Sequence, residues 1–175
     1  MTKYQLARLI AWAGALDTRK RAQKIVYLLQ AAGCPLDAEY RLHYYGPYSQ
    51  DVAQLVDELV AQGMLEESCT QTGGGRRFSY ALSETARVRL REYEATPAGQ
   101  AAAAALEPFQ ALFLRLLVTD LQELELASML VLEWQRGEGW LRATETTRFF
   151  KGEPANSSQL QRALELARAV VQQAA

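Results

Sequence analysis

One stretch in the first half of the chain combines an amphipathic helix, a glycine-rich hairpin and a further helix. Residues 50–62 place apolar side chains at helical spacing, and Gly63 follows them as a helix stop. Residues 66–71 and 76–82 have the composition of two strands, and three consecutive glycines stand in the turn between them. Ser83 is then a favourable N-cap for the next helix. This order of elements restricts the N-terminal half to a small number of folds.

The run from Ala61 to Leu90 resembles the closing part of a winged-helix domain, in which a β-hairpin wing follows a helix. Two earlier helices are expected, over residues 3–14 and from Asp17 or Thr18 to about residue 32. We therefore predict a mainly α fold with a small β-hairpin wing. It would consist of a winged-helix-like domain, residues 1–95, and a C-terminal helical region, residues 96–175, that packs on it as a bundle.

The C-terminal region is rich in leucine and contains two capping patterns. Thr119 with Gln122, and Ser158 with Gln161, are typical of a capping box at the start of a helix. The apolar faces of the helices in this region are wide. Such faces suit either packing within one molecule or a seam with a second copy of the chain. We expect the bundle, and a homodimer is the alternative.

Three tyrosines surround the Gly46-Pro47 pair, which is typical of a sharp corner. Residues 40–45 alternate and are rich in β-forming residues, so they predict a short strand, and Ser49 is the expected N-cap of the following helix. One face of such a strand is expected to be buried, which places at least two tyrosines in the core. An exposed tyrosine would instead suit the anchoring of a protein partner. The tyrosines concerned are Tyr44, Tyr45 and Tyr48.

Residues 24–67, about a quarter of the chain, resemble the YwgA-like proteins and the related Panacea antitoxin domain. The resemblance rests on a Lys-hydrophobic-Tyr-Leu helix at Lys24 to Gln30 and a Tyr-Gly-Pro-Tyr-Ser corner at Tyr45 to Ser49. An amphipathic helix with a glycine exit follows, from Val52 to Leu65. The resemblance implies a small cytoplasmic protein of bacterial, archaeal or phage origin. Some Panacea members neutralise toxins by direct binding and one acts as a proteolysis adaptor, so a protein partner, such as a toxin, is implied.

DNA binding is the alternative that a winged-helix-like fold raises. On the helix over residues 50–62, Gln50 and Gln54 are suited to read adenine, but three carboxylates share their face. Residues 34–48 look extended, so the helix that precedes the reading helix in an ordinary helix-turn-helix is missing. The net charge of −1 also lacks the basic excess typical of nucleic-acid binders. The basic residues suited to phosphates are Arg19, Lys20, Arg21, Lys24, Arg76 and Arg77, and the first four are equally explained as a solvated helix start.

Candidate chemistry in the sequence is sparse. His43 is the single histidine, and Cys34 and Cys69 have no metal-ligand spacing, so we predict no metal, no cofactor and no catalytic site. Unpaired cysteines fit a reducing cytosol. The N-terminal residues form an amphipathic pattern and not a signal peptide or a membrane span, so we expect a cytoplasmic protein without membrane contact.

The preferred hypothesis is a non-enzymatic regulatory protein that acts by protein–protein contact. Its partner-binding candidates are Tyr44, Tyr45, Tyr48, Gln50 and Gln54. The alternative is a winged-helix DNA-binding transcriptional regulator that uses the two glutamines and the basic residues named above.

Overall fold

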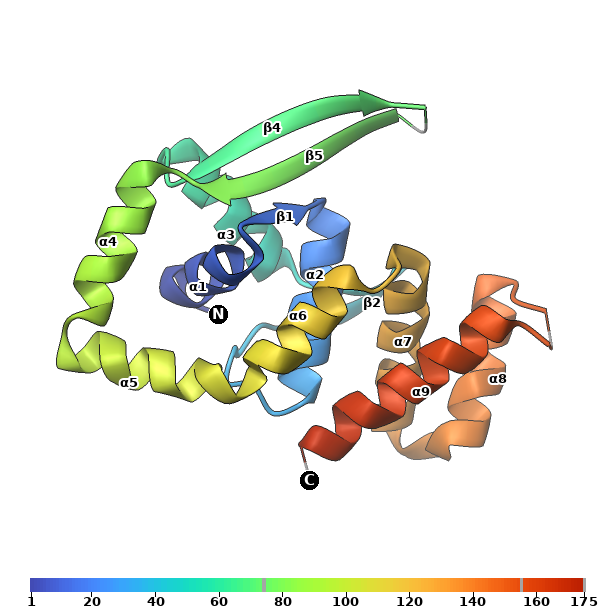
Figure 1. Cartoon of the computed structure of the whole chain (residues 1–175). Coiled ribbons are helices and arrows are strands. Elements are labelled where there is room, and N and C mark those ends of the chain that lie inside the picture. The colour runs from blue at the N-terminus through green and yellow to red at the C-terminus, as the bar shows by residue number, and fades with distance from the viewer. Residues whose placement is uncertain (74, 155, 175) are drawn as a thin grey trace.

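The computed structural model describes residues 1–73, 75–154 and 156–174, so Gly74 of the expected hairpin turn lies outside it. The chain is mainly helical with small antiparallel sheets, which confirms the expected fold class (Figure 1). The elements in chain order are α1 (Lys3–Ala13), β1 (Ala15–Asp17), α2 (Arg19–Ala31), β2 (Arg41–His43), β3 (Gly46–Tyr48), α3 (Gln50–Ala61), β4 (Leu65–Thr72), β5 (Gly75–Leu82), α4 (Glu84–Glu94), α5 (Pro97–Leu106), η1 (Glu107–Phe109), α6 (Gln110–Val118), α7 (Leu121–Glu133), η2 (Trp134–Glu138), α8 (Gly139–Lys151) and α9 (Ser158–Gln173).

A sheet with the strand order β1-β5-β4 carries the wing-like hairpin. Strands β4 and β5 pair along their whole length, and Figure 1 shows the hairpin extending past the helices beneath it. Strand β1 joins their edge, with Leu16 opposite Tyr80. The sequence pattern does not predict β1, because three residues are too few to show a β period. The pairing with β5 rather than local propensity therefore defines this strand.

The helix starts follow the predicted caps in the N-terminal half and differ from them in the C-terminal half. The N-caps of α3 and α4 are the predicted serines. Helix α7 is capped by Asp120 and not by Thr119, because the Asp120 carboxylate accepts hydrogen bonds from two backbone N–H groups of the first turn. Helix α9 is capped by Ser157 and not by Ser158. The predicted caps of α7 and α9 are each wrong by one residue.

Helix α2 lies at the centre of the hydrophobic core. Its residues Ile25, Val26, Leu28 and Leu29 are each at most 1% exposed. Helices α6, α7 and α9 all pack against α2, so the C-terminal half lies directly on the N-terminal half. Buried residues of both halves form one core. The division into two domains at residue 95 remains a prediction.

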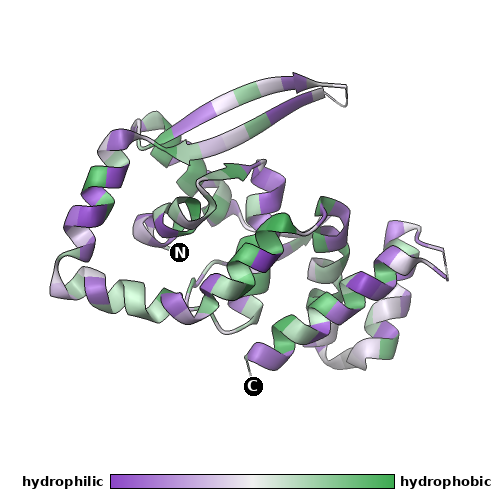
Figure 2. Cartoon of the chain, viewed as in Figure 1, coloured by the Kyte–Doolittle hydropathy of each residue, from purple (hydrophilic) through white to green (hydrophobic). Residues whose placement is uncertain are grey.

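The helical stretch over residues 97–118 is long and apolar enough to cross a membrane. Figure 2 shows its green colouring along α5 and α6. In this structure Leu106, Phe113 and Leu116 of the stretch are at most 1% exposed, and the Phe113 ring lies 5.7 Å from that of Trp12. Part of its apolar surface is therefore covered by the protein itself.

Candidate functional site

The tyrosine-rich segment forms a small β-hairpin between α2 and α3. Strands β2 and β3 are antiparallel, with His43 opposite Gly46, so Tyr44 and Tyr45 form a two-residue loop. The predicted corner at Gly46 and Pro47 is therefore wrong, because these two residues begin strand β3. Gly46 has a φ of 93°, which favours glycine, and Pro47 is tolerated because each strand of a two-stranded sheet is an edge strand.

All three tyrosines of the hairpin are exposed to solvent. Tyr44 is 76% exposed, Tyr45 51% and Tyr48 37%, so the prediction that at least two of them are buried is wrong. Every residue of β2 is exposed as well, because only β3 turns residues towards the helices. The aromatic packing inside this region comes from Tyr27 and Tyr40, whose rings meet edge to face at 4.9 Å.

The exposed rings form one ordered cluster, which we call the tyrosine hairpin (residues 43–48). The rings of Tyr44 and Tyr45 are perpendicular, with centroids 5.1 Å apart, and the His43 ring lies 5.5 Å from that of Tyr48. The Lys20 ammonium sits 4.5 Å from the centre of the Tyr45 ring, within the range of a cation–π contact. These contacts restrict the motion of the rings in the unbound protein.

Two side chains of α2 hold the tyrosine hairpin in place. The Gln23 side-chain amide donates to the Ser49 carbonyl at 2.8 Å and accepts from the Ser49 N–H at 2.9 Å. The Lys24 ammonium donates to the Pro47 carbonyl at 2.8 Å. Gln23 is 4% exposed and Lys24 is 2% exposed, so both bonds are shielded from water. Because Gln23 and Lys24 bind backbone atoms, the position of the hairpin does not depend on its exposed side chains.

The burial of Lys24 contradicts the prediction that it belongs to a solvated helix start. Desolvation lowers the pKa of Lys24 to about 8, and the carboxylate of Glu125 on α7 partly opposes this shift. Glu125 also pairs with Lys20 at 3.1 Å and with Lys151 of α8 at 3.9 Å. Glu125 thus pairs with two ammonium groups and acts on Lys24 through its charge, and the neighbouring positive charges lower the pKa of Lys24 further.

A cleft of about 290 Å³ opens between the tyrosine hairpin and the first turns of α2 and α3. Residues predicted for protein binding and residues predicted for DNA binding lie together in this cleft. The lining residues among them are Arg19, Lys20, Lys24, Tyr45, Tyr48 and Gln50, with His43 beside them. Gln54 on α3 and Tyr44 in the hairpin loop are both exposed, and neither residue lines the cleft.

Arg19 lines this cleft and has polar partners on α3, β4 and β5. Its guanidinium pairs with Asp57 of α3 at 2.6 Å and donates to the Tyr80 hydroxyl at 2.8 Å. Glu67 of β4 lies 3.5 Å away. The hydrogen bond to Tyr80 and the nearby carboxylate raise the pKa of Arg19, so its positive charge is permanent.

The remaining predicted basic residues lie elsewhere. Arg21 donates to the carbonyls of Leu117 and Thr119 at 3.0 and 2.7 Å, so it caps the end of α6. Arg77 on the wing pairs with Asp17 of β1. Arg76 is exposed beside it near the hairpin tip. The six basic candidates therefore do not form one surface.

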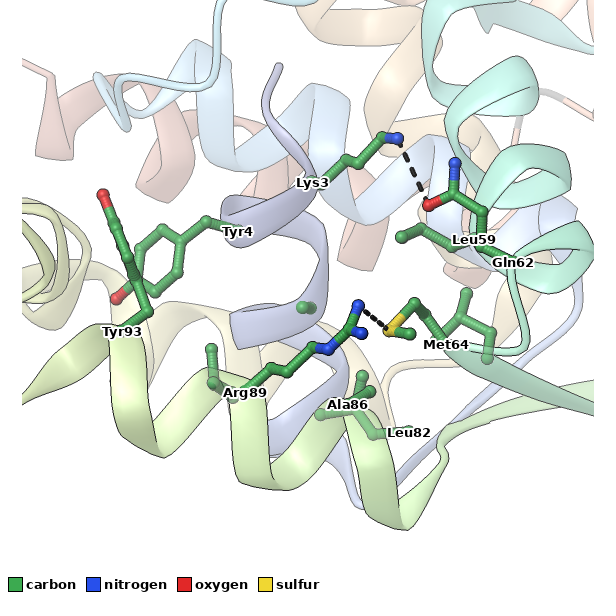
Figure 3. A pocket seen from close by; sticks show the side chains of 12 residues that line it. Lys3, Tyr4, Leu59, Gln62, Met64, Leu82, Ala86, Arg89 and Tyr93 are labelled. Atoms are coloured by element: carbon green, nitrogen blue, oxygen red, sulfur yellow. Dashed lines mark hydrogen bonds between the residues drawn. The ribbon is translucent and has the colours of Figure 1, made fainter.

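A second hollow lies between α1, α4 and the base of the wing (Figure 3). It is an apolar groove of about 240 Å³ in which the rings of Tyr4 and Tyr93 pack 5.0 Å apart at one end. Figure 3 also shows Arg89 donating to the Met64 sulfur, at 3.8 Å. None of the predicted site residues lines this groove, and the sequence gives no signal for it, because its walls come from distant segments.

The two cysteines differ in exposure, since Cys69 is exposed and Cys34 is buried. Cys34 is buried, and burial raises the pKa of its thiol to about 12, so the thiol stays protonated at neutral pH. Among the described residues, no three His, Cys, Asp or Glu side chains gather closely enough to hold a metal ion.

Together these features define a small, mainly α protein with a wing-like hairpin and an exposed aromatic site. No known protein-family model matches the chain. The chain is similar to the uncharacterized protein YwgA of Bacillus subtilis (strain 168), with 32% identity over 81 residues. The match covers 46% of this chain and 49% of YwgA, so the chain spans about half the length of this relative. The comparison supports the YwgA-like resemblance, and it does not address the Panacea or winged-helix ones.

Proposed function

We propose that this chain is a non-enzymatic regulatory protein that binds a protein partner through the tyrosine hairpin. The exposure of Tyr44, Tyr45 and Tyr48 on a firmly anchored hairpin carries this proposal. Tyrosine is enriched among the residues that dominate binding energy at protein interfaces. A rigid display lowers the conformational entropy that is lost on binding.

Gln50 and Gln54 extend this surface along α3. Both are exposed, and Gln50 also lines the cleft beneath the hairpin. Amide side chains donate and accept hydrogen bonds at an interface without the desolvation cost of a charge. The contact surface therefore has an aromatic centre and a polar margin, as is usual for protein interfaces.

The resemblance to the Panacea antitoxin domain supports an antitoxin-like or adaptor-like role, with a toxin as one kind of partner. A cytoplasmic location and the absence of membrane contact belong to the same proposal. The wide apolar faces of the C-terminal helices make a homodimer the alternative assembly.

Affinity capture from an extract of the native host tests the proposal. The wild-type chain should retain one protein in stoichiometric amount, and the double variant Tyr44→Ala/Tyr45→Ala should lose it. Phe149→Ala is the matched control, because it removes a comparably exposed aromatic ring far along the chain. Retention of the same protein by the double variant, or its loss with the control, would contradict the proposal.

DNA binding is the second candidate, and the order of α3, the hairpin and the β1-β5-β4 sheet favours it. The charges weigh against it, since Asp57 and Glu58 on the exposed face of α3 take up Arg19 and Lys3 in ion pairs. A gel shift on random duplex DNA at low salt tests this alternative. A shift that disappears in Arg76→Gln/Arg77→Gln would support it, and no shift would exclude it.

A further inference from the structure

We propose that the cleft between the tyrosine hairpin and helices α2 and α3 binds a small organic anion that carries an aromatic ring. This proposal goes beyond protein contact, because it concerns the hollow beneath the hairpin and not its outward face. It rests on the charge, the aromatic lining and the size of the cleft.

The charge of the cleft favours an anion. Arg19, Lys20 and Lys24 line it, and Asp57 is the carboxylate that faces them across the opening. Glu125 does not line the cleft, and it forms ion pairs with Lys20 and Lys151. The lining itself thus has three cationic side chains and one carboxylate, and Glu67, which pairs with Arg19, lies outside it as Glu125 does.

Lys24 gives the clearest indication of a missing partner. Its ammonium carries three N–H donors, and within the described residues one of them makes a hydrogen bond, to the Pro47 carbonyl. The side chain is 2% exposed, so water reaches the other donors poorly. A buried charge is stable only when it is paired and hydrogen-bonded. A carboxylate or phosphate oxygen in the cleft would supply both.

The aromatic residues indicate what the rest of the ligand is. Tyr45 and Tyr48 line the same cleft as the lysines, and His43 lies between them. Rings of this kind pack well against another planar ring. The Lys20 ammonium lies 4.5 Å from the centre of the Tyr45 ring. One ligand could therefore place an anionic group against Lys20 and an aromatic ring against Tyr45.

The size of the cleft sets the class of ligand. A volume of about 290 Å³ lies at the lower end of small-molecule sites. The ligand is therefore an aromatic carboxylate or an aromatic phosphate monoester of modest size. Lys24, Arg19 and Lys20 would bind the anionic group, and Tyr45 and Tyr48 would hold the ring.

Calorimetric titration of the whole chain with phenyl phosphate, at physiological ionic strength, tests the proposal. Inorganic phosphate and cyclohexyl phosphate are the matched probes that lack an aromatic ring. We expect saturable one-to-one binding of phenyl phosphate, stronger than that of either matched probe. Lys24→Met and Arg19→Gln should each weaken it by about 10- to 100-fold, the range typical of a lost charge-assisted hydrogen bond.

Arg76→Gln is the control, because it removes the same charge from the exposed wing and should leave the affinity unchanged. Tyr45→Leu should weaken phenyl phosphate and leave inorganic phosphate unaffected. Because Lys24→Met also removes the hydrogen bond to Pro47, Arg19→Gln, whose side chain is 45% exposed, provides an independent test. The absence of saturable binding at millimolar phenyl phosphate would overturn the proposal, as would an equal loss in Arg76→Gln. Equal affinity for the three probes would overturn its aromatic part.

Discussion

The ammonium nitrogen of Lys24 lies 2.8 Å from the carbonyl oxygen of Pro47, and this bond joins the central helix to the tyrosine hairpin. A buried lysine in this position opposes folding whenever it is charged, because it must leave water. The same lysine orients the hairpin that displays the tyrosines. Lys24 therefore links the stability of the fold to the orientation of the exposed tyrosines.

The first prediction concerns the pH dependence of stability. The pKa of Lys24 falls from its ordinary 10.5 to about 8 on folding, so between these values the unfolded state binds more protons and the free energy of unfolding rises with pH. Glu125 on α7 opposes the shift, whereas Lys20 on α2 and Lys151 on α8 reinforce it. Below pH 8 the charged lysine costs about 2–4 kcal/mol.

Lys24→Met should therefore gain stability relative to the wild type at pH 7 and lose most of this advantage by pH 10.5. Urea unfolding at the two pH values measures the difference. Lys3→Met, at an exposed position on α1, controls for the removal of a lysine. A difference between Lys24→Met and wild type that does not change with pH would contradict the account.

The second prediction concerns Gln23. Gln23→Ala leaves the buried N–H of Ser49 without a partner, whereas the Ser49 carbonyl keeps its hydrogen bond from the Ala53 N–H. We expect a loss of about 1–3 kcal/mol in the free energy of unfolding, since one unsatisfied buried group costs about 1–3 kcal/mol. Gln54→Ala on the exposed face of α3 should change the value by less than about 0.5 kcal/mol. Thermal unfolding of the two variants side by side provides the measurement.

The third prediction concerns Gly46. An added methyl group at Gly46 would lie 3.4 Å from the Lys24 ammonium, and the φ of 93° is unfavourable for any other residue. Gly46→Ala should therefore lower the free energy of unfolding by about 1–3 kcal/mol. Gly73→Ala is the control, because open space surrounds it and its φ is not in the unfavourable range. Similar stabilities of the two variants in urea would show that the hairpin tolerates a different backbone.

The fourth prediction separates the buried tyrosines from the exposed ones. Tyr27 is 5% exposed and its hydroxyl donates to the Gln135 side chain at 2.9 Å. Tyr27→Ala should cost about 3–5 kcal/mol, as expected for the removal of a core aromatic ring. Tyr44→Ala should change stability by less than about 0.5 kcal/mol. Differential scanning calorimetry would detect a reversal of this order.

The sequence predicts elements whose signals are local. Ser49 caps α3 as expected, because a cap depends on the residues next to it. The exposure of Tyr44 and Tyr45 is not local, since both residues lie in the hairpin loop and not on a strand face that packs against the helices. A strand pattern cannot show whether another element covers its outer face.

Lys24 and Gln23 illustrate the same limit within a helix. Helix α2 is buried on every side from Ala22 to Leu29, so even its polar positions face protein. An amphipathic pattern assigns polar residues to solvent, and it fails where helices and a hairpin surround one helix completely. The cleft is lined by residues of α2, α3 and the tyrosine hairpin. The sequence can therefore suggest these residues one by one, but it cannot show that they lie around one cleft.

Site-specific photo-cross-linking in the native host tests the central claim most directly. A photoreactive phenylalanine analogue placed at position 44 lies on the tyrosine hairpin, and the same analogue at position 149 lies on α8. The account predicts one prominent cross-linked protein from position 44 and none of that identity from position 149. No cross-link from position 44, or the same product from both positions, would contradict a partner-binding role for the tyrosine hairpin.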